Sequence, residues 1–226
     1  MRDNLGMTAT GRLAGVIAAI ALAAPLAAPL AAQSQKPAAL GVGKLLVANR
    51  KLADPNFIRS VILLLVYQDD AAVGLILNRR SHMSIASVYE MQEAKGRADV
   101  VYGGGPVERS STLALLRASE QPQGATKILG DVSLISGRGL LRRTMGSPVE
   151  ADSFRVFVGY AGWTGPQLQR EVEIGAWYIF PGDSKTIFDP DPQTLWSRLV
   201  ARTDGLLALL MPIPARAYSP LAAFGL

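Results

Sequence analysis

Few side chains in this sequence have the type and spacing that catalysis requires. Asp54, Glu108 and Asp183 are carboxylates that could act as general acids or bases. Ser110–Ser111 offers hydroxyl nucleophiles, but a serine needs a neighbouring base to take up its proton. The sequence has a single histidine, His82, and no pattern places it beside these serines. An unrecognised hydrolase is therefore the least favoured of our hypotheses, and we expect no catalytic residues.

Cysteine and histidine usage also limits metal and redox chemistry. The sequence contains no cysteine, which excludes disulfides, thiolate zinc sites and cysteine nucleophiles. Its single histidine excludes any site that needs two. Asp189 and Asp191 look like paired carboxylates, but the prolines that follow each of them indicate a turn and a helix start. We expect no metal and no cofactor.

A second group of side chains is better suited to binding. These residues come from loops beside apolar segments, and such loops could meet at a sheet edge, where aromatic rings supply area and polar groups supply direction. In this group, Asp54 and Arg79 could form an ion pair. The candidate ligand-binding residues are Asp54, Asn56, Asn78, Arg79, Gly104, Gly105, Tyr160, Trp163 and Gln167. The alternative is that these residues only lock loops in place through backbone hydrogen bonds.

The secondary-structure pattern is organised around residues 153–180, which predict a strand, a helix and a second strand. Apolar residues alternate from Ser153, and the strand is expected to end in the glycine-rich stretch from Gly159 to Gly165. Pro166 suits the first turn of a helix and Gly175 suits its C-terminal end. Elsewhere we expect strands at 43–48, 60–67, 72–77, 98–102, 113–116, 127–129 and 132–135, and helices after Ser84, at 137–145 and from Asp191.

Glycine and arginine clusters invite functional interpretations. Gly103–Gly105 could expose backbone N–H groups to an anion, but no helix follows it, and we expect a tight hairpin between the flanking strands. Arg138, Arg142 and Arg143 form the strongest basic cluster. The formal net charge of the chain is only +5, and no helix-turn-helix pattern is present, so nucleic acid is an unlikely partner.

The first 32 residues have the composition of an export signal. Arg2 and Arg12 precede an uncharged, alanine-rich apolar run at 13–32, and polar residues follow from Gln33. Leu30 makes the cleavage pattern imperfect, so an uncleaved N-terminal membrane anchor is the main alternative. We expect an exported, periplasmic or anchored protein; a misassigned start would instead leave it cytoplasmic. The expected domains are 1–32 signal or anchor, 33–41 linker, 42–209 folded domain and 210–226 tail.

Five short motifs, in this order and spacing, resemble the bacterial YqgE/AlgH family. They are Ala53–Phe57, Gly74–Arg79, Gly104–Val107, Gly159–Trp163, and Ala176–Trp177 followed by Pro181–Asp183. The resemblance covers about residues 40–209 and implies an α+β fold, in which a largely antiparallel sheet curves into an open pseudo-barrel flanked by helices. Three positions depart from the family pattern: Arg80 and Pro166 replace a proline and a glycine, and Leu116 stands where relatives often have histidine.

The resemblance implies little about function, because the family is mostly uncharacterised and some members are only candidate transcriptional regulators. We expect a non-enzymatic binding or regulatory domain whose ligand is an unknown small molecule or protein. A transcriptional regulator in the cytoplasm is the second hypothesis, and it needs a basic face for nucleic acid. A membrane would be a partner only through residues 13–32.

Processing of the N-terminus can be measured directly. In a bacterial host that expresses the full chain with a C-terminal tag, we expect the recovered protein to lack residues 1–32 and to appear in the exported fraction, because the apolar run follows a basic segment. Intact mass spectrometry of the tagged protein gives the answer. A mass that includes residue 1 in the membrane fraction would indicate the anchor, and the full mass in the cytoplasmic fraction would contradict export.

Overall fold

The computed structural model describes residues 39–89 and 92–210, with side chains to Asp204. These residues lie within one compact unit, Gln35–Leu226. The predicted signal at 1–32 and the tail beyond 210 lie outside the described residues.

The strands are β1 (Lys44–Ala48), β2 (Val61–Tyr67), β3 (Ala72–Ile76), β4 (Arg80–Ser84), β5 (Val100–Gly103), β6 (Val107–Arg117), β7 (Thr126–Leu129), β8 (Val132–Ile135), β9 (Phe154–Trp163) and β10 (Trp177–Pro181). The helices are α1 (Ile85–Val88), the 3-10 turn η1 (Gln92–Ala94), α2 (Arg138–Met145), α3 (Gly165–Glu173), α4 (Ser184–Ile187) and α5 (Pro192–Leu210).

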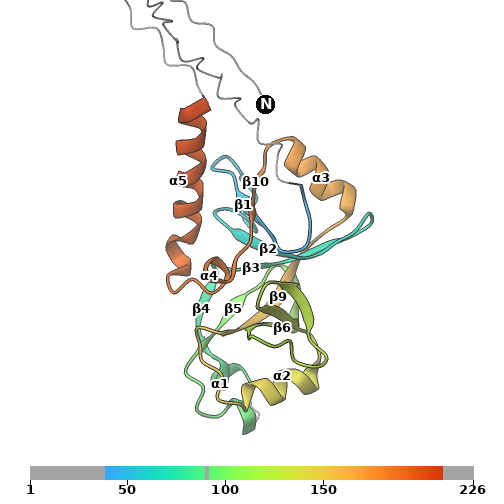
Figure 1. Cartoon of the computed structure of the whole chain (residues 1–226), viewed down its shortest axis with the longest axis vertical. Coiled ribbons are helices and arrows are strands. Elements are labelled where there is room, and N and C mark those ends of the chain that lie inside the picture. Colours follow the sequence, from blue (N-terminus) through green and yellow to red (C-terminus); the bar gives the residue numbers. More distant parts are fainter. Residues whose placement is uncertain (1–38, 90–91, 211–226) are drawn as a thin grey trace, which may run out of the picture. The chain divides into compact units, whose positions relative to one another are not determined.

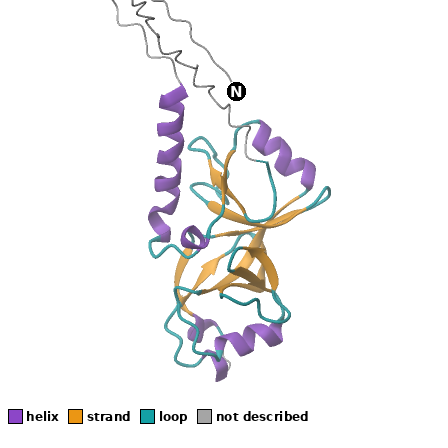
Figure 2. Cartoon of the chain, in the orientation of Figure 1, coloured by secondary structure: helices purple, strands orange, loops and turns teal. Residues whose placement is uncertain are grey.

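Ten strands form one curled sheet with the order β10-β1-β2-β3-β9-β6-β8-β7, and β5 joins β9 to β4 (Figure 1). Every pairing is antiparallel except the one between β5 and β9. Helices and strands are segregated, with helices placed outside the curled sheet (Figure 2). The predicted α+β fold with a curved antiparallel sheet is confirmed.

Strand β9 connects the two halves of the sheet. Its last residues, 161–163, pair with β3, and its residues 156–158 pair in parallel with β5 on the same side. Along its other side it pairs with β6, with one irregularity opposite Gly159. The strand ends at Trp163, inside the glycine stretch from Gly159 to Gly165, as predicted, although Gly159 itself lies within the strand. Gly159, at φ +68°, lets the strand change its twist and continue to Trp163.

The Gly103–Gly105 loop is not a hairpin, so that prediction was wrong. Strands β5 and β6 lie on opposite sides of β9, so the loop must pass over that strand. The N–H of Gly104 donates to the Val158 carbonyl at 2.8 Å, and the Gly104 carbonyl accepts the Ile76 N–H at 2.9 Å. Gly104 thus bridges β9 and β3 where these two strands separate.

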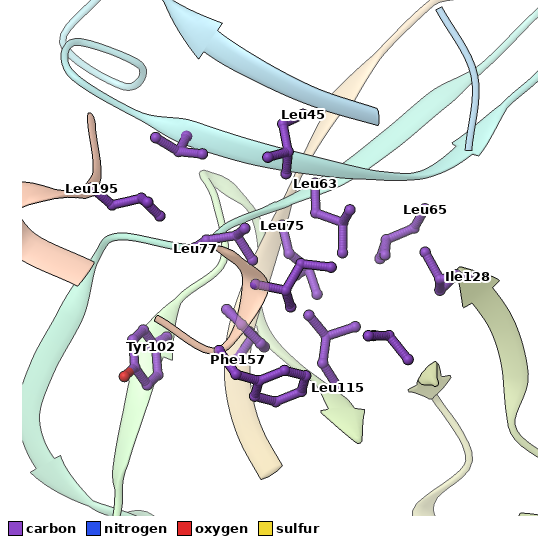
Figure 3. Close-up of a cluster of buried hydrophobic side chains, with 14 of the residues drawn as sticks. Leu45, Leu63, Leu65, Leu75, Leu77, Tyr102, Leu115, Ile128, Phe157 and Leu195 are labelled. Atoms are coloured by element: carbon purple, nitrogen blue, oxygen red, sulfur yellow. The ribbon is translucent and has the colours of Figure 1, made fainter. Parts of the chain in front are cut away.

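Strand β2 is buried on both faces, as its continuous apolar run predicted. On the inner face Leu63 and Leu65 join residues of β3, β6, β9 and α5 in the cluster drawn in Figure 3. On the outer face Ile62 and Leu64 pack with Trp163, Leu168 and other residues under α3. Its hairpin with β3 is also confirmed, and Gly74 is required there because a Cβ would lie 2.5 Å from a methyl group of Ile62.

The helices begin where the sequence predicted. Ser84 caps α1, Thr164 caps α3 and Asp183 caps α4, each by accepting a backbone N–H. Gly175, at φ +76°, follows the last turn of α3, as expected. Helix α5 begins at Pro192 and reaches Leu210, the first residue of the predicted tail. No helix in the described ranges is both long enough and apolar enough to cross a membrane.

Gly104→Ala should destabilise the domain by about 2–3 kcal/mol, because overpacking a rigid site forces backbone shifts. The new Cβ would lie 2.2 Å from the Gly159 carbonyl oxygen. Gly137→Ala is the matched control, since open space surrounds that Cβ and its φ is negative, and we expect a change within about 0.5 kcal/mol. Urea unfolding of both variants tests this, and equal midpoints would contradict the close approach.

Candidate functional site

Three of the motif loops meet at one shallow hollow of about 220 Å³. It contains the predicted residues Asn56, Arg79 and Gly105, which come from three different motifs. The remaining lining residues are Gly103, Pro106, Arg109 and Val158. Nη2 of Arg79 donates to the Asn56 carbonyl, so the guanidinium also ties two of the loops together. We call this group the Arg79 hollow.

Arg79 is half-buried in this hollow, and its surroundings act on its charge in opposite directions. Burial lowers the pKa of its guanidinium, whereas the negative charge of Asp54 raises it. The guanidinium remains charged at neutral pH, because arginine starts from so high a pKa. The carboxylate of Asp54 accepts the Asn56 N–H at 2.8 Å, and no ion pair among the described residues joins it to Arg79. The predicted ion pair was therefore wrong, although the two charges attract.

Asn78 acts as a lock between two strands. Its Oδ1 accepts the Val61 N–H at 2.9 Å and its Nδ2 donates to the Arg59 carbonyl at 2.8 Å. This side chain therefore mimics a strand partner at the start of β2. Arg59, at φ +53°, adopts a left-handed backbone there, and the amide of Asn78 satisfies its carbonyl.

Trp163 and Gln167 take part in an aromatic cluster elsewhere. Trp163 stacks on Phe57 at 5.3 Å between ring centroids and meets Trp177 edge-on at 6.1 Å. Oε2 of Glu171 accepts both indole N–H groups, at 3.1 Å from Trp163 and 2.8 Å from Trp177. Gln167 donates to the other carboxylate oxygen at 3.0 Å. The two tryptophans at the ends of α3 are thus held by one carboxylate, and neither Trp163 nor Gln167 lines the Arg79 hollow.

Tyr160 and Gly105 meet through their backbones. A Cβ on Gly105, at φ +159°, would lie 2.1 Å from the carbonyl carbon of Tyr160, so only glycine fits there. Burial raises the pKa of the Tyr160 hydroxyl, and the nearby Glu108 carboxylate raises it further. Tyr160 packs against the inner core cluster and does not line the Arg79 hollow.

No hydrogen bond or ion pair among the described residues joins the candidate acids, bases and nucleophiles to one another. His82 and Ser110 are both exposed, on β4 and β6 respectively. Asp189 accepts the Asp191 N–H at 2.9 Å, which is the turn geometry that the prolines predicted. Within the described ranges no three residues of the types His, Cys, Asp and Glu are grouped so that they could hold a metal ion.

A larger pocket, of about 480 Å³, lies around Arg155 and was missed by sequence reasoning. Its basic lining residues are Arg80, Arg117, Arg155 and Lys185, and its acidic ones are Asp99 and Asp152. Its apolar wall includes Val100, Tyr102, Phe154, Phe188 and Pro190. The signal available in the sequence was Arg155 itself, a charged residue within the apolar run Phe154–Phe157.

Arg155, the second residue of β9, is only 5% exposed although it carries a charge. Its Nη1 donates to the Ile187 carbonyl at 2.9 Å and its Nη2 to the Asp189 carbonyl. These two hydrogen bonds attach the segment between α4 and α5 to the central strand. The guanidinium also lies over the Tyr102 ring, with its carbon 4.9 Å from the ring centroid.

The order and nature of these elements agree with a known family. Residues 45–208 match the family described as AlgH-like, DUF179. The chain belongs to the AlgH-like family. It is 37% identical over 185 residues to a UPF0301 protein of Thermobifida fusca and 33% identical over 182 residues to one of Streptomyces avermitilis. Each alignment covers 76% of this chain and 91% of the relative.

Solved structures agree with the fold of this AlgH-like chain. The solution structure of the AlgH protein from Pseudomonas aeruginosa superimposes with a TM-score of 0.60 at 27% identity, covering 80% of this chain and all of that one. A crystal structure from Corynebacterium diphtheriae gives a TM-score of 0.63 at 22% identity, covering 79% and 91%. The predicted family and fold are therefore confirmed.

Trp163→Ala should lower the free energy of unfolding by about 3–5 kcal/mol, because a large buried ring is replaced by a cavity. Trp163 is 6% exposed and stacks on Phe57. Arg170→Ala, at an exposed site on the adjacent helix α3, serves as the control and should change stability by no more than about 0.5 kcal/mol. Thermal and urea unfolding provide the measurement. Melting of Trp163→Ala at the wild-type temperature would show that the aromatic cluster contributes no stability.

Proposed function

We propose that this AlgH-like domain binds a ligand without transforming it, and that its motif loops form the binding surface. The observation that carries this proposal is the meeting of Asn56, Arg79 and Gly105 at one hollow. Loops that only needed to be locked could be attached to the sheet at separate places. Here three of them expose polar groups to the same space.

The chemistry of the Arg79 hollow suits a ligand that carries hydrogen-bond acceptors. Arg79 is oriented by its bond to the Asn56 carbonyl, so little side-chain entropy is lost when it donates to a ligand. Arg109 is exposed on the rim and adds a second cation. The glycines leave the wall without side chains, which allows a ligand to approach the backbone closely. A small polar molecule or an extended protein segment would fit this description.

Export of the domain is part of the same proposal and is supported by the sequence of residues 13–32. The processing experiment tests it separately from binding.

Arg79→Gln should weaken the binding of a ligand in the Arg79 hollow by about tenfold or more, since a charge-assisted hydrogen bond would be lost. A ligand-observed NMR screen of a defined set of common metabolites, against the full chain and its variants, is the measurement. Arg138→Gln, an exposed arginine on α2, carries the same charge change and should bind like wild type. Arg109→Gln is a second variant that leaves the bond between Arg79 and Asn56 intact.

Two results would contradict the proposal. In the first, every compound that binds wild type binds Arg79→Gln and Arg109→Gln equally well. In the second, no compound binds wild type while all the proteins melt cooperatively. In either case the motif loops would serve only to lock the sheet.

A further inference from the structure

We propose that the pocket around Arg155 is a second binding site, which takes a small molecule bearing an oxyanion, either a carboxylate or a phosphate group. It uses residues outside the family motifs, so it is independent of the Arg79 hollow. Adjacent residues are divided between the two: Arg79 and Gly103 line the hollow, whereas Arg80 and Tyr102 line the pocket.

Arg155 is buried and forms no ion pair among the described residues. A buried guanidinium is costly unless it is paired and fully hydrogen-bonded. Its two terminal nitrogens donate to neutral carbonyls, and its Nε is buried with no partner among the described residues. Asp189, the acidic residue whose charge raises the pKa of this guanidinium, forms its ion pair with Arg198 instead, at 2.8 Å. An anion in the pocket would supply the charge that the fold does not.

The surroundings of Arg155 reinforce this point. Burial lowers the pKa of its guanidinium, the groups of Tyr102 and Asp189 raise it, and the nearby positive charge of Arg80 lowers it further. Two cations held near one another are stabilised by an anion between them. Arg80 pairs directly with Tyr102 in the β4–β5 ladder, which fixes its backbone on this side of the sheet.

The positive and negative side chains that line the pocket do not balance. Two charged lining residues are neutralised by partners outside the pocket: Arg117 by Asp131 at 2.9 Å and Asp99 by Arg97 at 2.8 Å. Arg80 and Lys185 form no ion pair within the part of the chain that the structure describes. The lining therefore keeps three positive charges, on Arg80, Arg155 and Lys185, against one negative charge on Asp152.

The pocket also has an apolar wall. Tyr102, Phe154 and Phe188 line the pocket. The guanidinium of Arg155 lies 4.9 Å from the Tyr102 ring and 5.7 Å from the Phe188 ring. A volume of about 480 Å³ is within the range of small-molecule sites. Cations at the rim and aromatic side chains in the wall together fit an anion attached to an apolar or planar body.

A purely structural role for Arg155 explains less. Its bonds to the Ile187 and Asp189 carbonyls do attach α4 and the start of α5 to β9. That role does not account for the unpartnered Nε, nor for the placement of Arg80 and Lys185 around the same space. Since an Arg155 variant would also break the attachment, the test substitutes the two exposed cations instead.

The experiment is a titration of the full chain by NMR chemical shifts or calorimetry, at constant ionic strength. The probes are inorganic phosphate, benzoate and the uncharged benzamide, which has nearly the shape of benzoate. The variant is Arg80→Gln with Lys185→Gln, and the matched control is Arg138→Gln with Arg143→Gln, which removes the same charge from exposed positions on α2. Thermal melting confirms that each protein is folded.

We expect at least one of the two anions to bind wild type and the α2 control alike, with a dissociation constant of about 1 mM or tighter. The Arg80/Lys185 variant should bind it about tenfold more weakly, and benzamide should bind far more weakly than benzoate. Preference for phosphate or for benzoate decides which oxyanion the site takes.

Three results would overturn the inference. One is no saturable binding of either anion by the folded wild-type chain. Another is equal weakening in the Arg80/Lys185 variant and the α2 control, which would indicate general charge attraction. The third is equal affinity for benzoate and benzamide, which would show that the pocket recognises an apolar body and not a charge.

Discussion

The close approach of the Gly103–Gly105 loop to strand β9 is the contact on which the rest of the sheet depends. Strand β9 pairs with β3 at one end and with β5 at the other, and the backbone groups of Gly104 bridge the point where these neighbours separate. A side chain at Gly104 or Gly105 would overlap the backbone of Gly159 or Tyr160. The absence of side chains therefore lets one long strand belong to both halves of the sheet.

This crossing also arranges the two candidate binding sites. The loop brings Gly105 to the guanidinium of Arg79 on one side, and the preceding residue Tyr102 lies under the guanidinium of Arg155. Because β9 pairs with both β5 and β3, the Gly103–Gly105 loop that crosses it has little freedom to move. Such a rigid support is what a binding surface made of loops requires.

The polar side chains of the domain divide into two groups with different physical roles. Glu171 accepts both indole N–H groups, and Asn78 hydrogen-bonds two backbone groups at the start of β2, so these side chains hold the fold together. Asp54 and Asp183 accept backbone N–H groups at turns and helix starts. The family match therefore establishes the fold, whereas Arg79 and Arg155 have charge that this fold does not neutralise, and the proposals about binding rest on that charge.

The sequence by itself determined the family, the strand–helix–strand unit at 153–180, the hairpin of β2 with β3 and the helix caps, because apolar periodicity and turn residues act over a few neighbouring positions. Only the tertiary structure decided that β5 and β6 lie on opposite sides of β9, that Gly159 lies within a strand, and that Asp54 is not paired with Arg79. These depend on contacts between distant segments. The burial of Arg155 was hidden for the same reason: alternation along one strand cannot show that α4 and the start of α5 will cover the face on which Arg155 lies.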